Sequence, residues 1–281
     1  MKNLLLLLLL SLFLFGCAKE HSGLNPQDEF LNGDVSYGND PAQTMDVYLP
    51  AGRSANTTKF LVLIHGGGWN EGDKSDFTIY IDSLRKRLPD WAFFNVNYRL
   101  YHDGNNKFPT QENDVKAAVS FILSKKDSFQ VSSRYGILGA SAGGHLALLQ
   151  AYKNSVVQPT AVISYFGPTD LASLYQLSND PYLQLLLSTL TGTTPSLHSD
   201  VYQESSPVQF VNSSSCATLL LHGDKDALVP LGQSQLLKAK LDAAGVVNKL
   251  VVYPGQGHGW LGTPLSESFT QVQNFLQVQF P

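Results

Sequence analysis

The sequence predicts an α/β fold in which helices cover both faces of a mostly parallel sheet. Residues 60–64 and 91–96 are continuous apolar runs, which is typical of strands buried on both faces. Residues 114–123 instead place their apolar side chains on one helical face. Strands that alternate with helices along the chain indicate a parallel sheet, because parallel strands need a crossover between them.

The same patterns predict the elements in order. Strands are expected at residues 35–37, 45–49, 60–64, 91–96, 136–138, 161–166, 219–222 and 249–253. Helices are expected at residues 114–123, 145–152, 233–243 and 267–276. The sequence has no internal repeat and no Pro/Gly-rich break in this stretch, so residues 31–281 are expected to form a single domain.

The composition excludes several classes of protein. Apolar residues make up 43% and charged residues 15% of the 281-residue chain, as in globular and not in disordered proteins. The net charge of −4 argues against a nucleic-acid partner, since nucleic-acid binders carry a basic face. The two cysteines belong to no CxxC or Cys/His cluster, so no metal site is expected.

The N-terminus has the features of a bacterial lipoprotein signal peptide. Lys2 precedes a 12-residue, leucine-rich stretch ending at Phe15, which is too short to span a membrane and matches a signal-peptide apolar region. The stretch ends in LFGC, which resembles a lipoprotein box with Cys17 as the lipidated residue. Residues 1–16 are then removed, and lipid on Cys17 anchors the protein in the membrane of the bacterial cell envelope. An ordinary secretory signal with a chance cysteine is the alternative.

Residues 17–30 are expected to form a flexible tether between this lipid and the domain, because they are polar and contain Gly and Pro. Lipidation of Cys17 would leave Cys216 without a disulfide partner. Cys216 precedes an apolar run, so we expect it to be a small buried side chain with no chemical role.

Residues 139–143 fit the pattern G-x-S-x-G with Ser141 at its centre. The motif follows a predicted strand and precedes a helical segment, which is the context that it requires. Glycines flank the serine because the turn from strand to helix is too tight for side chains. Ser141 is thereby exposed at a helix N-terminus, where backbone N–H groups favour negative charge. An ordinary glycine-rich helix start is the alternative.

A second glycine motif, HGGGW at residues 65–69, follows the predicted strand at residues 60–64. Three successive glycines allow bare backbone to approach a ligand. A flexible turn is the alternative, but the position after a buried strand and the presence of G-x-S-x-G favour a ligand-binding loop.

A nucleophilic serine needs a histidine base and a carboxylate that orients the base, and with this motif the chain order is serine, acid, histidine. Of the seven histidines, His258 lies in a glycine-rich loop after the last predicted strand and is the predicted base. His65 and His222 follow strands directly and are expected to brace neighbouring turns.

Three aspartates are candidates for the acid. Asp226 is favoured because it begins the segment that leads into the helix at residues 233–243. Asp224 is expected to shape its turn by bonding its own backbone, and Asp170 follows an earlier strand.

Together these motifs resemble those of the α/β-hydrolases, close to the hormone-sensitive-lipase-like esterases and the bacterial acetyl xylan and feruloyl esterase-like carboxylesterases. The resemblance covers residues 33–278 and implies the α/β-hydrolase fold, a mostly parallel eight-stranded sheet with helices on both faces. Ser141, Asp226 and His258 match the catalytic triad of that family. Ala140 stands where the lipase-like branch usually has aspartate, which favours the carbohydrate-esterase branch.

The resemblance also implies an activity. The backbone N–H groups of Gly67, Gly68 and Ala142 match the oxyanion hole, which stabilises the negative oxygen of the tetrahedral intermediate. The expected reaction is hydrolysis of short-acyl esters, of acetyl or feruloyl type on polysaccharide, through an acyl-enzyme and without a cofactor. The alternatives are a small serine peptidase or amidase of the prolyl-oligopeptidase-like type, and a catalytically silent glycan-binding lipoprotein.

Residues 182–190 lie in the long connection before the strand at residues 219–222, and connections of this kind overhang the ligand crevice. Four leucines there share one helical face, which is expected to pack on the core and to roof the acyl side of the site: Leu183, Leu186, Leu187 and Leu190. Tyr175 and Tyr182 are expected to stack on a sugar or phenolic ring.

Overall fold

The computed structural model describes residues 24–281, except residues 155, 156 and 179. The expected signal peptide at residues 1–16 and the predicted lipidation site Cys17 lie outside the described residues. Within the described part of the chain, no helix is both long enough and apolar enough to cross a membrane.

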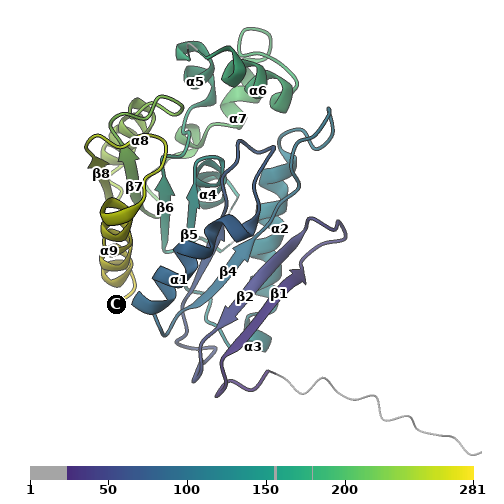
Figure 1. Cartoon of the computed structure of the whole chain (residues 1–281), viewed down its shortest axis with the longest axis vertical. Helices are drawn as coiled ribbons and strands as arrows, with labels where there is room; N and C mark the ends of the chain where they lie inside the picture. The colour runs from purple at the N-terminus through teal and green to yellow at the C-terminus, as the bar shows by residue number, and fades with distance from the viewer. Residues whose placement is uncertain (1–23, 155–156, 179) are drawn as a thin grey trace, which may run out of the picture.

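Eight strands of the described residues form one sheet in the order β1-β2-β4-β3-β5-β6-β7-β8 (Figure 1). The strands are β1 (Phe30–Ser36), β2 (Thr44–Leu49), β3 (Phe60–Ile64), β4 (Ala92–Val96), β5 (Tyr135–Ala140), β6 (Ala161–Tyr165), β7 (Ala217–Gly223) and β8 (Asn248–Tyr253). β2 pairs antiparallel with β1 and with β4, and all other neighbours are parallel. The sheet confirms the predicted fold class.

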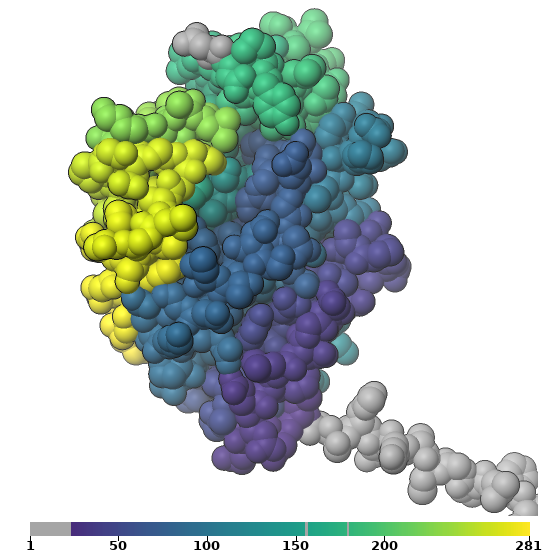
Figure 2. All heavy atoms as spheres, viewed as in Figure 1, coloured from purple at the N-terminus to yellow at the C-terminus, as the bar shows by residue number. Residues whose placement is uncertain are grey.

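Helices cover both faces of this sheet. In chain order they are the 3-10 helix η1 (Lys74–Phe77), α1 (Thr78–Arg87), α2 (Thr110–Ser124), α3 (Lys126–Phe129), α4 (Ala142–Tyr152), α5 (Leu171–Leu177), α6 (Pro181–Thr191), α7 (Ser199–Glu204), the 3-10 helix η2 (Pro207–Phe210), α8 (Gly232–Ala243) and α9 (Gly262–Gln279). α2, α4 and α8 pack on one face of the sheet, and α1 and α9 pack on the other. Figure 2 shows α1 in blue beside α9 in yellow on the second face.

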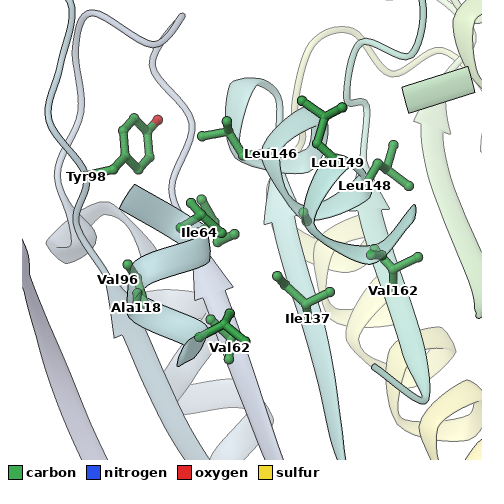
Figure 3. Packing of buried hydrophobic residues seen from close by; sticks show 14 of the residues in the cluster. Val62, Ile64, Val96, Tyr98, Ala118, Ile137, Leu146, Leu148, Leu149 and Val162 are labelled. Atoms are coloured by element: carbon green, nitrogen blue, oxygen red, sulfur yellow. The ribbon is translucent and has the colours of Figure 1, made fainter. Parts of the chain in front are cut away.

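The core is divided by the alternation of side chains along the buried strands. In β3, Val62 and Ile64 point toward α2 and α4, whereas Leu61 and Leu63 point toward α1 and α9. Figure 3 shows members of the first group, which include Val62 and Ile64 of β3, Ala118 of α2 and Leu146 of α4. A strand that is buried on both faces must be apolar at every position, which explains the unbroken run FLVLI.

The parallel strands β3, β5, β6, β7 and β8 all end at the same edge of the sheet. Loops that follow these strands are therefore brought together, and ligands of open α/β sheets bind in the crevice outside such carboxyl ends. α5, α6 and α7 lie beyond this edge (Figure 1).

Residues 24–30 are the described part of the tether predicted at residues 17–30, and they lie against the opposite edge of the domain. Arg53 is buried before β3, and its guanidinium donates to the carbonyl oxygens of Asn25 at 3.0 Å, Asp28 at 2.5 Å and Phe129 at 3.1 Å. Phe129 precedes β5, so these contacts lie where the parallel strands begin. The chain thus enters the domain at the edge remote from the carboxyl ends of the strands.

Candidate active site

Ser141 lies at the sharp turn between β5 and α4. Its backbone has φ 54° and ψ −123°, a conformation that residues other than glycine rarely adopt. A Cβ on Gly139 would lie 2.1 Å from the Gly143 carbonyl oxygen, and a Cβ on Gly143 would lie 2.1 Å from the Ile64 carbonyl oxygen. Both positions therefore require glycine, as the motif predicts.

Three side chains from three different loops meet at this turn. His258 Nε2 lies 2.8 Å from Ser141 Oγ, and His258 Nδ1 lies 2.8 Å from Asp226 Oδ2. Asp226 follows β7 and His258 follows β8, so the parallel order of the sheet brings both to Ser141. A hydroxyl, an imidazole and a carboxylate in one hydrogen-bonded chain can act as a nucleophile with its base and orienting acid.

The Asp226 carboxylate is buried, and its neighbours keep it ionised. Asp226 Oδ1 accepts hydrogen bonds from the backbone N–H groups of Leu228 at 3.0 Å and Val229 at 2.9 Å. Burial raises the pKa of Asp226, but hydrogen bonds from His222 and His258 outweigh burial and hold this pKa well below its usual range. An ionised Asp226 holds the hydrogen of His258 on Nδ1, which leaves Nε2 able to accept the serine proton.

The two other candidate aspartates make structural contacts. Asp224 Oδ1 accepts from the backbone N–H of Gly255 at 2.7 Å. Asp224 was expected to accept from the backbone of its own turn. This expectation is wrong, because the donor is Gly255 in the loop after β8. Asp170 caps the N-terminus of α5 by accepting from the backbone N–H groups of Ala172 and Ser173, each at 3.1 Å.

His65 braces the glycine loop, which confirms its predicted role. Its Nδ1 lies 2.8 Å from the Gly66 carbonyl oxygen, and its ring stacks on Tyr98 with 4.3 Å between the ring centroids. The Tyr98 hydroxyl donates to the carbonyl oxygen of His65 at 3.1 Å. Burial lowers the pKa of His65, so the ring is neutral at this position. The sequence alone assigned no role to Tyr98. This residue lies in the segment NYRL, directly after β4.

His145 braces the same loop from α4, a role that sequence reasoning missed. Trp69 Nε1 donates to His145 Nδ1 at 3.2 Å, and His145 Nε2 lies 2.7 Å from the Ser205 carbonyl oxygen. Because a carbonyl oxygen only accepts, the ring carries its hydrogen on Nε2. Burial lowers the pKa of His145 to about 4. Trp69, at the end of HGGGW, is the sequence feature that could have indicated such a partner, because a buried indole N–H needs an acceptor.

Ser141 and His258 line a pocket of about 360 Å³ at the carboxyl edge of the sheet. The glycine loop contributes to its wall, with positive φ angles of 101° at Gly67 and 56° at Gly68. Ala142 is the first residue of α4, and the first N–H groups of a helix have no acceptor within it. The predicted oxyanion donors therefore lie in the loop and the turn that flank Ser141.

Apolar side chains of α6 cover the pocket. Tyr182, Leu183 and Leu186 line it, while Leu187 and Leu190 are fully buried in the core. Both expectations for this segment are met, because its leucine face packs on the core and also bounds the pocket. Tyr182 is 60% exposed, so its ring is open to a ligand at the pocket.

Two further side chains lie away from this pocket. Tyr175 packs against Tyr202, with ring centroids 6.0 Å apart, and does not line the pocket, so the expectation that it stacks on a substrate ring is wrong. Cys216 is buried, and burial raises the pKa of its thiol to about 12, as expected for a side chain without a chemical role.

Among the described residues, no group of three or more His, Cys, Asp or Glu side chains could hold a metal ion.

The chain also matches a protein-family model. The family model described as BD-FAE matches residues 45–241, which is more than half of the chain. The chain belongs to the BD-FAE family. The matched range contains Ser141 and Asp226, and His258 follows its end.

This BD-FAE protein is also similar to curated esterases. Esterase LipC of Mycobacterium tuberculosis is 26% identical to it over 242 residues, which is 80% of this chain and 59% of LipC. The chain thus spans only about half to three-fifths of the length of the first curated relatives that it matches.

Solved structures share the fold of the BD-FAE chain. A bifunctional GH43-CE protein from Bacteroides eggerthii superposes with a TM-score of 0.79 at 25% identity, covering 92% of this chain and 39% of that one. A truncated form of a carbohydrate esterase from gut microbiota superposes with a TM-score of 0.77 at 25% identity, covering 91% of this chain and 98% of that one. The fold is that of the α/β-hydrolases, as the motifs predict.

Proposed function

We propose that this chain is a serine carboxylesterase with Ser141 as nucleophile, His258 as general base and Asp226 as the orienting acid. The observation that carries the proposal is the hydrogen-bonded chain from Asp226 through His258 to Ser141, with 2.8 Å at each step, at the wall of a largely apolar pocket. The similarity to esterases supports the choice of an ester bond.

The chemistry follows from the positions of these atoms. His258 Nε2 takes the proton of Ser141 Oγ as the oxygen attacks the ester carbonyl carbon. The backbone N–H groups of Gly67, Gly68 and Ala142 stabilise the oxyanion, and removal of one such donor costs about 10²–10³-fold in kcat. His258 then gives its proton to the leaving alcohol. Water, activated by the same imidazole, hydrolyses the acyl-enzyme and restores the serine.

The preferred substrate in this proposal is a short-acyl ester, of acetyl or feruloyl type, on a polysaccharide. Leu183 and Leu186 bound the pocket on its apolar side, which limits the length of the acyl group. Tyr182 is exposed at the pocket and can stack on a sugar or phenolic ring. The gut carbohydrate esterase that superposes over 98% of its length supports a carbohydrate ester.

The test compares p-nitrophenyl acetate with a panel of peptide p-nitroanilides, using the wild type and Ser141→Ala. The proposal expects turnover of the ester, weak or no turnover of the anilides, and loss of ester turnover in the folded Ser141→Ala variant. Preference for anilides would indicate the peptidase alternative. Turnover of neither class, with retained glycan binding, would indicate a silent binding protein.

We also propose that the mature protein is held at the bacterial cell envelope by lipid on Cys17. The support is the leucine-rich stretch that ends in LFGC. The described chain enters the domain at the edge opposite Ser141, so the lipid attachment point and the pocket belong to opposite ends of the domain. Cys17→Ser should release the protein from membranes of its host. Retention of this variant after a high-salt wash would contradict lipidation at Cys17.

A further inference from the structure

A second buried histidine lies against the carboxylate of the proposed triad. His222 is on β7, four residues before Asp226, and its Nε2 lies 3.3 Å from Asp226 Oδ2. Both side chains are fully buried, at 0% exposure. His222 takes no part in the proton transfers of the proposed mechanism. Its contacts indicate a different role.

The contacts of His222 fix where its hydrogen lies. Its Nε2 is 2.7 Å from the Val229 carbonyl oxygen, which can only accept, so Nε2 carries the hydrogen. Its Nδ1 is 2.7 Å from Ser234 Oγ, whose hydroxyl can donate to it. A neutral ring therefore satisfies both nitrogens, and its Nε2 also lies 3.3 Å from Asp226 Oδ2.

This N–H completes the donors around Asp226. Oδ1 accepts from the backbone N–H groups of Leu228 and Val229, whereas Oδ2 accepts from His258 Nδ1 at 2.8 Å and lies 3.3 Å from His222 Nε2. A carboxylate oxygen has about two lone-pair sites, so Oδ2 can take the nearby His222 N–H as a second partner besides His258. Without His222, Oδ2 would keep only the hydrogen bond from His258 Nδ1 among those described.

We infer that His222 is a positioning residue that holds Asp226 Oδ2 in line with Nδ1–H of His258. The inference rests on the proposed triad, because it assigns His222 a role through Asp226. His222 of β7 and His258 of the loop after β8 are the titratable groups that contact the Asp226 carboxylate among the described residues. Loss of the His222 donor raises the pKa of Asp226, because that hydrogen bond lowers it in the native site.

The test uses two polar substitutions of His222, each of which keeps the contact of only one of the two ring nitrogens. The amide of His222→Gln reaches the place of Nε2 and can still donate to Asp226. The amide of His222→Asn reaches only the place of Nδ1, so it keeps the Ser234 contact and loses the Asp226 contact. Ser234→Ala is the matched control, since it removes a His222 contact that does not touch Asp226.

The readouts are kcat and KM for p-nitrophenyl acetate from pH 4 to 9, with circular dichroism to verify folding. We expect His222→Asn to lower kcat by about 10- to 100-fold, since misplacement by about 1 Å costs up to 10²-fold, and to leave KM within about 2-fold. His222→Gln and Ser234→Ala should stay within about 3-fold of the wild type.

The outcomes separate this role from the proposed function. A wild type without ester turnover refutes the esterase proposal itself. An active wild type with an equally active, folded His222→Asn overturns the role of His222. Equal losses in His222→Asn and Ser234→Ala also overturn it, because they show that the ring only braces the turn. Equal losses in the folded Gln and Asn variants refute the role of the Nε2 hydrogen.

Discussion

Asp226 and Asp224 lie two residues apart, but they contact different parts of the site. Asp226 binds His258 Nδ1 at 2.8 Å, whereas Asp224 binds the backbone N–H of Gly255 at 2.7 Å. Asp226→Asn should lower kcat by about 10⁴-fold, because an amide favours the wrong tautomer of the histidine. Asp224→Asn should cost less than about 10-fold, since an amide oxygen can still accept from Gly255. Steady-state kinetics on both folded variants provide the measurement, and a larger loss in Asp224→Asn would contradict the assignment.

His145 makes folding stability depend on pH. Its pKa is lowered to about 4 by burial in the fold, whereas a histidine in the unfolded chain titrates near 6.5. The unfolded state therefore takes up a proton first as the pH falls. The contribution of a neutral His145 is fully present above pH 6.5 and is lost as the pH falls toward 4.

The free energy of unfolding should fall by about 3 kcal/mol over this interval through His145 alone. Urea denaturation at pH 7.5, 5.5 and 4.5 measures the change. His145→Gln is the control, because its amide can donate to Ser205 and cannot titrate. An identical pH dependence in the wild type and in His145→Gln would contradict the argument.

At the scale of single residues, the sequence predicts the members of the proposed triad, because these residue types follow a fixed order along the chain in proteins with this motif. Ser141, Asp226 and His258 were found from the order serine, acid, histidine, and the structure brings them into hydrogen-bond contact. His145 and Tyr98 were missed because they act on the glycine loop from α4 and from the end of β4. Trp69 of HGGGW indicates that an acceptor is needed, but not which remote segment supplies it.

Among the elements, α6 limits the size of the pocket. A Cβ placed on Gly68 would lie 3.2 Å from Leu186 Cδ2, so this leucine abuts the glycine loop beside Ser141. Leu186→Ala should raise kcat/KM for octanoate relative to acetate esters by about 10-fold, as one methylene in an apolar pocket is worth about 10- to 200-fold. Leu185→Ala is the control, because Leu185 is on the same helix and 60% exposed.

The measurement is kcat/KM for p-nitrophenyl acetate, butyrate, octanoate and palmitate with each variant. The wild type should prefer acetate or butyrate. A wild-type maximum at palmitate, or an equal shift in Leu185→Ala and Leu186→Ala, would contradict the view that α6 sets the acyl length.

The elements that the sequence predicts are those with a strong apolar period. All eight strands lie at or within a few residues of the expected positions. The central strands β3 to β7 are buried on both faces and therefore largely apolar, whereas β2 alternates between buried and half-buried positions. α1, α5 and α7 were not expected. α1 buries only Ile81 and Leu84, and α5 buries only Leu171 and Leu174, which is too little apolar surface to produce a helical period.

At the scale of the whole molecule, the parallel sheet separates the two ends of the domain. The loops after β5, β7 and β8 carry Ser141, Asp226 and His258 to one edge, while Arg53 holds the entering chain at the other. The fold class follows from alternating strands and helices, but the strand order depends on pairing between distant segments. The resemblance to a known family predicted a mostly parallel sheet of eight strands, but not that β2 runs antiparallel to its neighbours β1 and β4.

The proposed mechanism depends most on Ser141 as its nucleophile. The direct measurement is covalent labelling with a fluorophosphonate, followed by digestion and mass spectrometry to locate the adduct. We expect a single adduct on Ser141, with labelling slowed by at least about 10³-fold in His258→Ala, since a serine hydroxyl needs its base to react. No adduct, or an adduct on another serine while Ser141 remains unmodified, would contradict the proposed catalytic site.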